Sequence, residues 1–253
     1  MSASTSRRAV YLEEMGISPL WKSREHTSNA AGTESTSVPV EENNLVENVP
    51  VPAEEPVTLY TDWTSLESAI SGCTACGLCR GRTRVVPGVG DRKAAWLFVG
   101  EGPGFHEDQQ GEPFVGRSGQ LLDNMMRAMG LRRGENTYIA NIVKCRPTDD
   151  TGKDRPPSLE EASTCRTYLD SQIALIEPRI IIALGRTAAV SLLNTDPQAT
   201  LASLRGKVHS LSMGGRDIPL IATYHPAYLL RNPISKRQAW ADLCRALTAS
   251  DTP

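Results

Sequence analysis

Four short apolar runs, each followed by a stretch with helical periodicity, constrain the fold of this chain most. They span residues 94–100 (AAWLFVG), 137–143 (TYIANIV), 179–184 (RIIIAL) and 218–223 (IPLIAT). Because their apolar character is continuous rather than alternating, they are typical of parallel strands buried on both faces. Helical stretches between them complete βαβ units. We therefore expect an α/β fold, a three-layer sandwich around a central, mostly parallel four-stranded sheet.

Three of the expected helices have clear sequence signals. Apolar residues at helical spacing follow Gly119, and Ser158 forms a capping box with Glu161 at the start of a second helix. The last helix is predicted from four residues that recur at i, i+3, i+4 and i+7: Trp240, Leu243, Cys244 and Leu247. We expect this face of the last helix, with Cys244, to be buried.

The chain divides into three parts by composition. Residues 1–26 contain enough apolar side chains for a short helix, which would dock on another protein or pack on its own domain. Residues 27–58 are acidic, rich in Ser and Pro and poor in large apolar residues, which predicts a disordered linker. Residues 59–253 form the expected folded domain.

Charge and cysteine content bear on location and partners. Residues 1–60 carry a net charge of −5 and residues 61–253 a net charge of +3, which is compatible with a polyanionic ligand but does not require one. No run approaches the ~20 apolar residues of a membrane span, and no signal peptide is evident, so we expect a cytoplasmic protein without membrane contact. In that reducing compartment the six cysteines are not expected to form disulfides, and the clustered ones are expected to bind metal.

The ends of the predicted strands indicate where a ligand binds. In open parallel sheets, ligands bind beyond the carboxyl ends of the strands, where the loops converge. The loops that follow the four runs begin at Glu101, around Lys144, at Gly185 and at Tyr224. We therefore expect Glu101, Asn141, Gly185 and His225 to lie close together.

These loops also carry recognisable motifs. They read, in order, GEGPG (100–104), ED (107–108), PFVG (113–116), NIVKCRP (141–147), ALG (183–185) and YHPAYLLRNP (224–233). A glycine-rich turn lets backbone amides approach a ligand closely, and a histidine held before a proline is well placed to donate a hydrogen bond. The series resembles the motifs of family 4 uracil-DNA glycosylases over residues 73–247, nearly the whole predicted domain.

This resemblance implies an enzyme with the uracil-DNA glycosylase fold that acts on uracil-containing DNA. Such an enzyme hydrolyses the bond between uracil and deoxyribose on an extruded nucleotide and leaves an abasic site. The sugar develops positive charge and uracil leaves as an anion, so a hydrogen-bond donor is needed at uracil O2. The resemblance assigns this role to His225.

The resemblance also implies the residues that bind the base. Asn141 matches the amide that reads the polar edge of uracil, because an amide offers both a donor and an acceptor. Phe114 matches the aromatic residue that stacks on the base, and Gly100 lies in the adjoining turn.

The carboxylate that positions water is less directly implied. Sister families have an acidic residue where this chain has Gly102. Glu101 is therefore the first candidate and Glu107 the second, and all three residues are expected to line the substrate site.

The cysteines form a second group of candidate ligands. Spacing alone leaves a structural zinc and an iron-sulfur cluster open, since either takes four thiolates. The resemblance implies a [4Fe-4S] cluster on Cys73, Cys76, Cys145 and Cys165, and leaves Cys79 as an extra cysteine.

DNA contacts are expected from basic residues beside the motifs. The candidates are Lys144, Arg146 and Arg231, with further basic residues nearby: Arg80, Arg82, Arg84, Lys236 and Arg237. Leu229 matches a residue that wedges into the duplex, although a core position is an equal alternative. We expect a monomer. Two other classes remain open, a non-catalytic DNA-binding protein of the same fold and an iron-sulfur redox protein.

Overall fold

The computed structural model describes residues 59–250 of the chain. The expected N-terminal segment of residues 1–26 and the expected linker of residues 27–58 lie outside the described residues. Within residues 59–250 no helix combines the length and the apolar character needed to cross a membrane.

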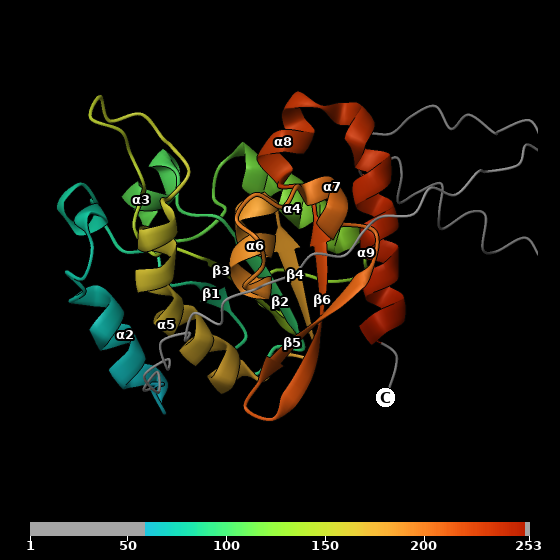
Figure 1. Cartoon of the computed structure of the whole chain (residues 1–253), viewed down its shortest axis with the longest axis horizontal. Coiled ribbons are helices and arrows are strands. Elements are labelled where there is room, and N and C mark those ends of the chain that lie inside the picture. The colour runs from blue at the N-terminus through green and yellow to red at the C-terminus, as the bar shows by residue number, and fades with distance from the viewer. Residues whose placement is uncertain (1–58, 251–253) are drawn as a thin grey trace, which may run out of the picture.

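A six-stranded sheet forms the middle of the domain (Figure 1). Its strands are β1 (Val89–Gly90), β2 (Trp96–Gly100), β3 (Thr137–Asn141), β4 (Ile180–Leu184), β5 (Val208–Met213) and β6 (Arg216–Thr223). The order across the sheet is β1-β3-β2-β4-β6-β5. The central four are parallel to one another and correspond to the four predicted strands. The expected count of four was wrong, because the short edge strands β1 and β5 add antiparallel pairings.

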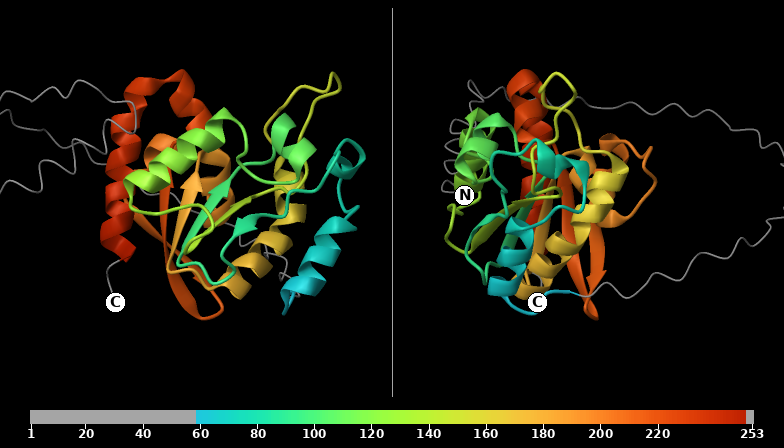
Figure 2. Two further views of the ribbon diagram at one scale, coloured as in Figure 1. Left: turned by 180° about the vertical axis from the view of Figure 1, so that it is seen from behind. Right: turned by 90° about the vertical axis from the view of Figure 1, so that its left-hand side faces the viewer.

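Helices cover both faces of this sheet and complete the three layers (Figures 1 and 2). They are α2 (Trp63–Ser71), α3 (Phe105–Gln110), α4 (Arg117–Ala128), α5 (Leu159–Ile176), α6 (Arg186–Leu193), α7 (Leu201–Leu204), α8 (Pro226–Arg231) and α9 (Lys236–Ser250), with 3₁₀ turns η1 (Gly77–Arg80) and η2 (Pro233–Ser235). One core cluster holds residues of α5, α6 and α7, and the other holds residues of α4, α8 and α9.

Alternate residues of each central strand enter the two cores. In β2, Leu97 and Val99 pack on the α5 side, whereas Trp96 and Phe98 pack on the α4 side, and all four side chains are buried. Burial on both faces explains why the strand sequences are continuously apolar. The three-layer α/β architecture is therefore confirmed.

The predicted start of α5 is confirmed, whereas the predicted buried face of α9 is not. Ser158 and Glu161 form the predicted capping box at the start of α5. In α9 the buried residues are Ala239, Asp242, Leu243 and Ala246. The expected burial of Cys244 was wrong, because the buried face is shifted by one residue and includes an aspartate.

Candidate active site

The ends of the central strands meet where the sequence predicted. A Cβ atom added to Gly100 would lie 2.4 Å from Asn141 Oδ1 and 2.6 Å from the ring of Phe114. The rings of Phe114 and His225 have centroids 5.4 Å apart, and a Cβ atom at Gly185 would lie 3.2 Å from that of His225. The expected grouping of these loops is confirmed. Only glycine at position 100 leaves space between the amide of Asn141 and the ring of Phe114.

Phe114 is held in an unusual backbone conformation. Its φ angle of 57° lies in the left-handed region, which non-glycine residues rarely adopt. The guanidinium of Arg133 donates to the Phe114 carbonyl at 2.9 Å. A Cβ atom at Gly119 would lie 1.8 Å from the same oxygen, so α4 packs directly on this peptide. Such strain persists only where the surroundings fix it, and it often marks a functional site.

Asn141 presents an unused acceptor. The residue is only 2% exposed. In the part of the chain that the structure describes, its Oδ1 is the one buried side-chain polar atom without a hydrogen-bond partner. A buried polar atom without a partner is costly, and natural proteins keep very few of them. The geometry therefore leaves this oxygen available to a hydrogen-bond donor supplied by a ligand.

His225 is fixed in a neutral form with one free donor. It is the N-cap of α8, and its Nδ1 accepts the amide hydrogen of Ala227 at 3.2 Å. Burial, reinforced by the positive charge of Arg231, lowers the pKa of His225 to about 4, and Glu107 opposes this shift. A neutral imidazole whose Nδ1 is an acceptor carries its hydrogen on Nε2. This N–H is then the donor that His225 can offer to a bound base.

The two candidate carboxylates differ in their surroundings. Glu101 follows β2, and its carboxylate accepts a hydrogen bond from the hydroxyl of Thr187 at the start of α6. Glu107 is buried, and its carboxylate accepts from the backbone amides of Gly104, Val115 and Gly116. Glu107 therefore ties the loop to the start of α4, whereas Glu101 has fewer partners.

The turn that lacks a carboxylate is tightly packed. A Cβ atom at Gly102 would lie 2.8 Å from Val143 Cγ2, closer than side chains normally approach. A larger residue at position 102 would require Val143 to shift.

The sequence analysis did not identify Thr187 as a site residue. It lies three residues after the end of β4, near the N-terminus of α6. A hydroxyl near the start of a helix that follows a strand is the signal that would have found it.

Two expected DNA contacts are wrong. Lys144 is 1% exposed, and its Nζ donates to the carbonyl of Asn141 at 2.9 Å and to Gln172 Oε1 at 2.7 Å. Burial lowers the pKa of Lys144 to about 8. Leu229 is fully buried and belongs to the α4 core, so it cannot act as a wedge in this structure. Both side chains therefore make their contacts inside the protein rather than at its surface.

The two other expected contacts, Arg146 and Arg231, differ in exposure, because the side chain of Arg146 is only 15% exposed. Arg146 pairs with Asp154 at 2.6 Å, and its guanidinium carbon lies 5.1 Å from the ring centroid of Phe105, which is itself half exposed. Arg231, at the end of α8, is exposed.

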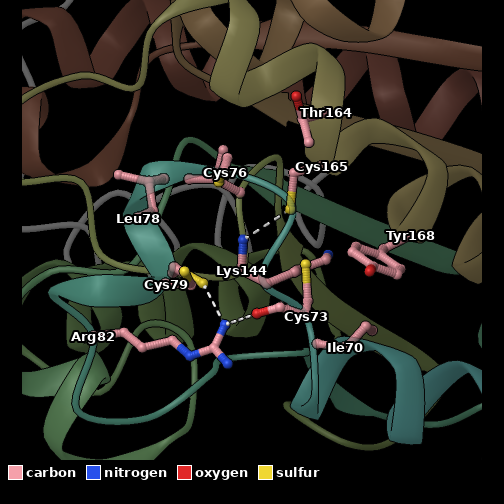
Figure 3. A pocket seen from close by; sticks show the side chains of 12 residues that line it. Ile70, Cys73, Cys76, Leu78, Cys79, Arg82, Lys144, Thr164, Cys165 and Tyr168 are labelled. Carbon is pink, nitrogen blue, oxygen red and sulfur yellow. Dashed lines mark hydrogen bonds between the residues drawn. The ribbon is translucent and has the colours of Figure 1, made fainter.

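Five cysteines line one pocket (Figure 3). They come from the loop after α2, from η1, from the segment after β3 and from α5: Cys73, Cys76, Cys79, Cys145 and Cys165. Among residues 59–250 no three His, Cys, Asp or Glu side chains are arranged to hold a single metal ion. The lining of the pocket contains the four expected cysteines and also Cys79.

Two cysteine sulfurs in this pocket accept hydrogen bonds. Arg82 Nη1 donates to Cys145 Sγ at 3.2 Å, and the backbone amide of Lys144 donates to Cys165 Sγ at 3.4 Å. Burial raises the pKa of both thiols, to about 11 for Cys165, and the neighbouring cationic groups oppose this shift. N–H donors of this kind favour thiolates, which are the form that binds metal.

The fold agrees with the comparison to protein families. Residues 87–244 match the uracil DNA glycosylase superfamily. The type-4 uracil-DNA glycosylase of Archaeoglobus fulgidus is 42% identical over 68% of this chain and 85% of its own length. Type-4 uracil-DNA glycosylases of Pyrobaculum aerophilum and Thermotoga maritima are 39% and 44% identical, over 72% and 64% of this chain and 91% and 80% of theirs. The chain belongs to the type-4 uracil-DNA glycosylases.

Proposed function

We propose that this protein hydrolyses the N-glycosidic bond of deoxyuridine in DNA, releasing uracil and leaving an abasic site. The observation that carries the proposal is the unpartnered Oδ1 of Asn141, which lies beside the ring of Phe114 and across from His225. An acceptor left unpaired in a buried site selects ligands that bring a donor.

Uracil matches the polar groups of this site. Its N3–H would donate to Asn141 Oδ1, and its O4 would accept from the amide nitrogen of the same residue. Cytosine has no hydrogen on N3 and carries an amino group in place of O4, so both contacts would be mismatched. The ring of Phe114 offers a face on which the extruded base stacks.

His225 supports departure of the base. When the bond to the sugar breaks, its electron pair goes to uracil, and negative charge develops at O2. A neutral imidazole donating Nε2–H stabilises this charge without transferring its proton. Water supplies hydroxide to C1′ of the sugar, and its remaining proton balances the charge of the uracil anion.

Glu101 is the proposed water-positioning carboxylate. The hydroxyl of Thr187 fixes one of its oxygens and leaves the other for water or for the cationic sugar. Glu107 is engaged by three backbone amides, so its proposed role is to hold the substrate loop rather than to activate water.

We also propose that the cysteine pocket holds a [4Fe-4S] cluster on Cys73, Cys76, Cys145 and Cys165. The donor set fits, because soft thiolates suit iron-sulfur centres and N–H groups already point at two of the sulfurs. When bound, the cluster supplies structural cross-linking between the loop after α2, the segment after β3 and α5. Cys79 is not needed as a ligand in this assignment.

Arg146 and Arg231 are the remaining proposed contacts to DNA phosphates: Arg231 is exposed at the end of α8, and the side chain of Arg146 is 15% exposed beside Asp154. We further propose that the enzyme acts as a monomer in the cytoplasm.

The test is excision from an oligonucleotide with a single uracil, followed by alkali to cleave abasic sites. Asn141→Ala and His225→Ala should each lose roughly 10²–10³ in rate. Asn124→Ala, on the surface of α4, and His209→Ala, on β5, are matched controls and should keep the wild-type rate. A wild-type protein that leaves uracil in place would refute the proposal and would favour a non-catalytic DNA-binding or redox protein.

A further inference from the structure

A surface groove lies between the segment after α7 and the start of α9. It is lined by residues at the end of α7, in η2 and along α9, and three of them are arginines: Arg205, Arg237 and Arg245. We call this cavity the arginine groove. Ile234, at its rim in η2, is 90% exposed, the highest value among the large apolar side chains within residues 59–250.

The groove carries excess positive charge. Its neighbouring carboxylate is Asp242, which is fully buried and accepts from Arg205 and from the hydroxyl of Thr223. Arg245 approaches the same carboxylate only at 3.7 Å, and Arg237 is exposed with no ion pair among residues 59–250. Three guanidinium groups around one carboxylate leave a net charge of about +2, which favours an anionic ligand.

Arg205 is held rigidly with one donor group free. Its Nε and Nη2 donate to Asp242, and Nη2 also donates to the carbonyl of Gln238. Its Nη1 donates to no acceptor in the described part of the chain. Because Asn141 Oδ1 is the one buried unpaired side-chain atom there, this Nη1 must reach solvent. A fixed guanidinium with a free edge loses little entropy when it binds an anion.

The groove lies next to the segment that carries His225. The guanidinium carbon of Arg205 lies 5.1 Å from the ring centroid of Tyr224, the residue before His225. Tyr224 stacks on Tyr228 with centroids 4.9 Å apart and donates its hydroxyl to Gln238 of α9. In Figure 1, α7, α8 and the start of α9 lie together at the end of the sheet where β4 and β6 terminate. The groove therefore lies at the same end of the sheet as His225.

We propose that the arginine groove binds backbone phosphates of the DNA strand flanking the extruded nucleotide, with Ile234 packed against an adjacent sugar or base. This proposal rests on the proposed function for the position of the nucleotide. The combination of guanidinium groups with an exposed apolar side chain favours a nucleic acid strand, which presents both phosphates and apolar faces.

The test measures affinity for a uracil-free duplex by fluorescence anisotropy over a range of salt concentrations. The double variant Arg237→Ala/Arg245→Ala should weaken binding at least about tenfold in low salt and reduce the slope of log K against log[salt] by roughly 1–2, since each phosphate contact contributes about 0.9. Ile234→Ala should weaken binding without changing the slope.

The matched control removes the same charge from the opposite end of the sheet. Arg179 precedes β4 and Arg216 begins β6, and both are exposed, so Arg179→Ala/Arg216→Ala should leave affinity and slope unchanged. Equal losses in both double variants would mean a general charge effect and would overturn the proposal, as would no loss in either. A groove variant that loses binding of polyglutamate but not of DNA would assign the groove to an acidic protein instead.

The readout does not depend on uracil excision. A wild-type protein that fails to release uracil, while the groove variants still weaken duplex binding, would remove the proposed function and keep the groove.

Discussion

The protonation state of His225 gives the sharpest prediction for this protein. Its pKa is lowered from 6.5 to about 4, chiefly by burial. At pH 7 only roughly one molecule in a thousand would carry an imidazolium, and at pH 5 about one in ten. If the neutral ring donates Nε2–H to the departing base, the contribution of His225 to excision should be constant from about pH 5.5 to 8 and should fall only near pH 4.

The same shift predicts a pH dependence of stability. The unfolded chain, with an ordinary histidine, binds more protons than the folded chain between about pH 4 and 6.5, so the free energy of unfolding must fall as the pH is lowered through this window. From the two pKa values, His225 alone should make the protein about 2 kcal/mol less stable at pH 5 than at pH 8.

The assays are single-turnover excision from pH 4 to 8 and urea unfolding at pH 5 and 8, for wild type and for His225→Gln. The variant should lose roughly 10²–10³ in excision rate and should also lose about 2 kcal/mol of the pH dependence of stability. His209→Gln, on β5, is the control and should retain the wild-type rate. An excision rate that falls tenfold per pH unit above 6.5 would mean that the imidazolium is the active form and would refute this reasoning.

Other variants test the remaining parts of the site. Gly100→Ala should lower excision by about 100-fold in single-turnover assays, because its methyl group would lie 2.4 Å from the amide oxygen of Asn141; an unchanged rate would contradict the proposed base pocket. Cys145→Ser should remove bound iron and the brown colour and lower the melting temperature, whereas Cys79→Ser should keep both; iron analysis that gives the reverse order would show that the ligand set is wrong. Lys144→Met should cost about 2–4 kcal/mol in urea unfolding, because it leaves two buried acceptors unpaired, and should leave the salt dependence of DNA binding unchanged; a reduced slope would restore Lys144 as a phosphate contact.

The four central strands and the meeting of their loops could be predicted because parallel strands buried on both faces leave a strong, local apolar signal. The edge strands could not be found in that way, since β1 has two residues and β5 has only one buried residue, Leu211. The paired glycines Gly214 and Gly215 between β5 and β6 are a hairpin signal that would have identified β5.

The burial of three residues could not be predicted from the sequence, because it depends on residues far away in the chain. Lys144 looks like a surface cation, but Gln172 on α5 supplies an acceptor inside the protein. Leu229 follows the motif histidine by four residues, and only the packing of α8 on α4 shows that it points inward. The buried face of α9 was mispredicted because it contains Asp242. An aspartate is rarely buried unless a partner such as Arg205 neutralises it.

Lys144 connects the base site and the cysteine pocket, which the sequence motifs indicate separately. Its amide donates to Cys165 Sγ, and its ammonium donates to the carbonyl of Asn141. Lys144, which holds the backbone of Asn141, thus also contacts a cysteine of the cysteine pocket. Loss of the proposed cluster would therefore disturb the segment that holds Asn141 together with the cysteine pocket.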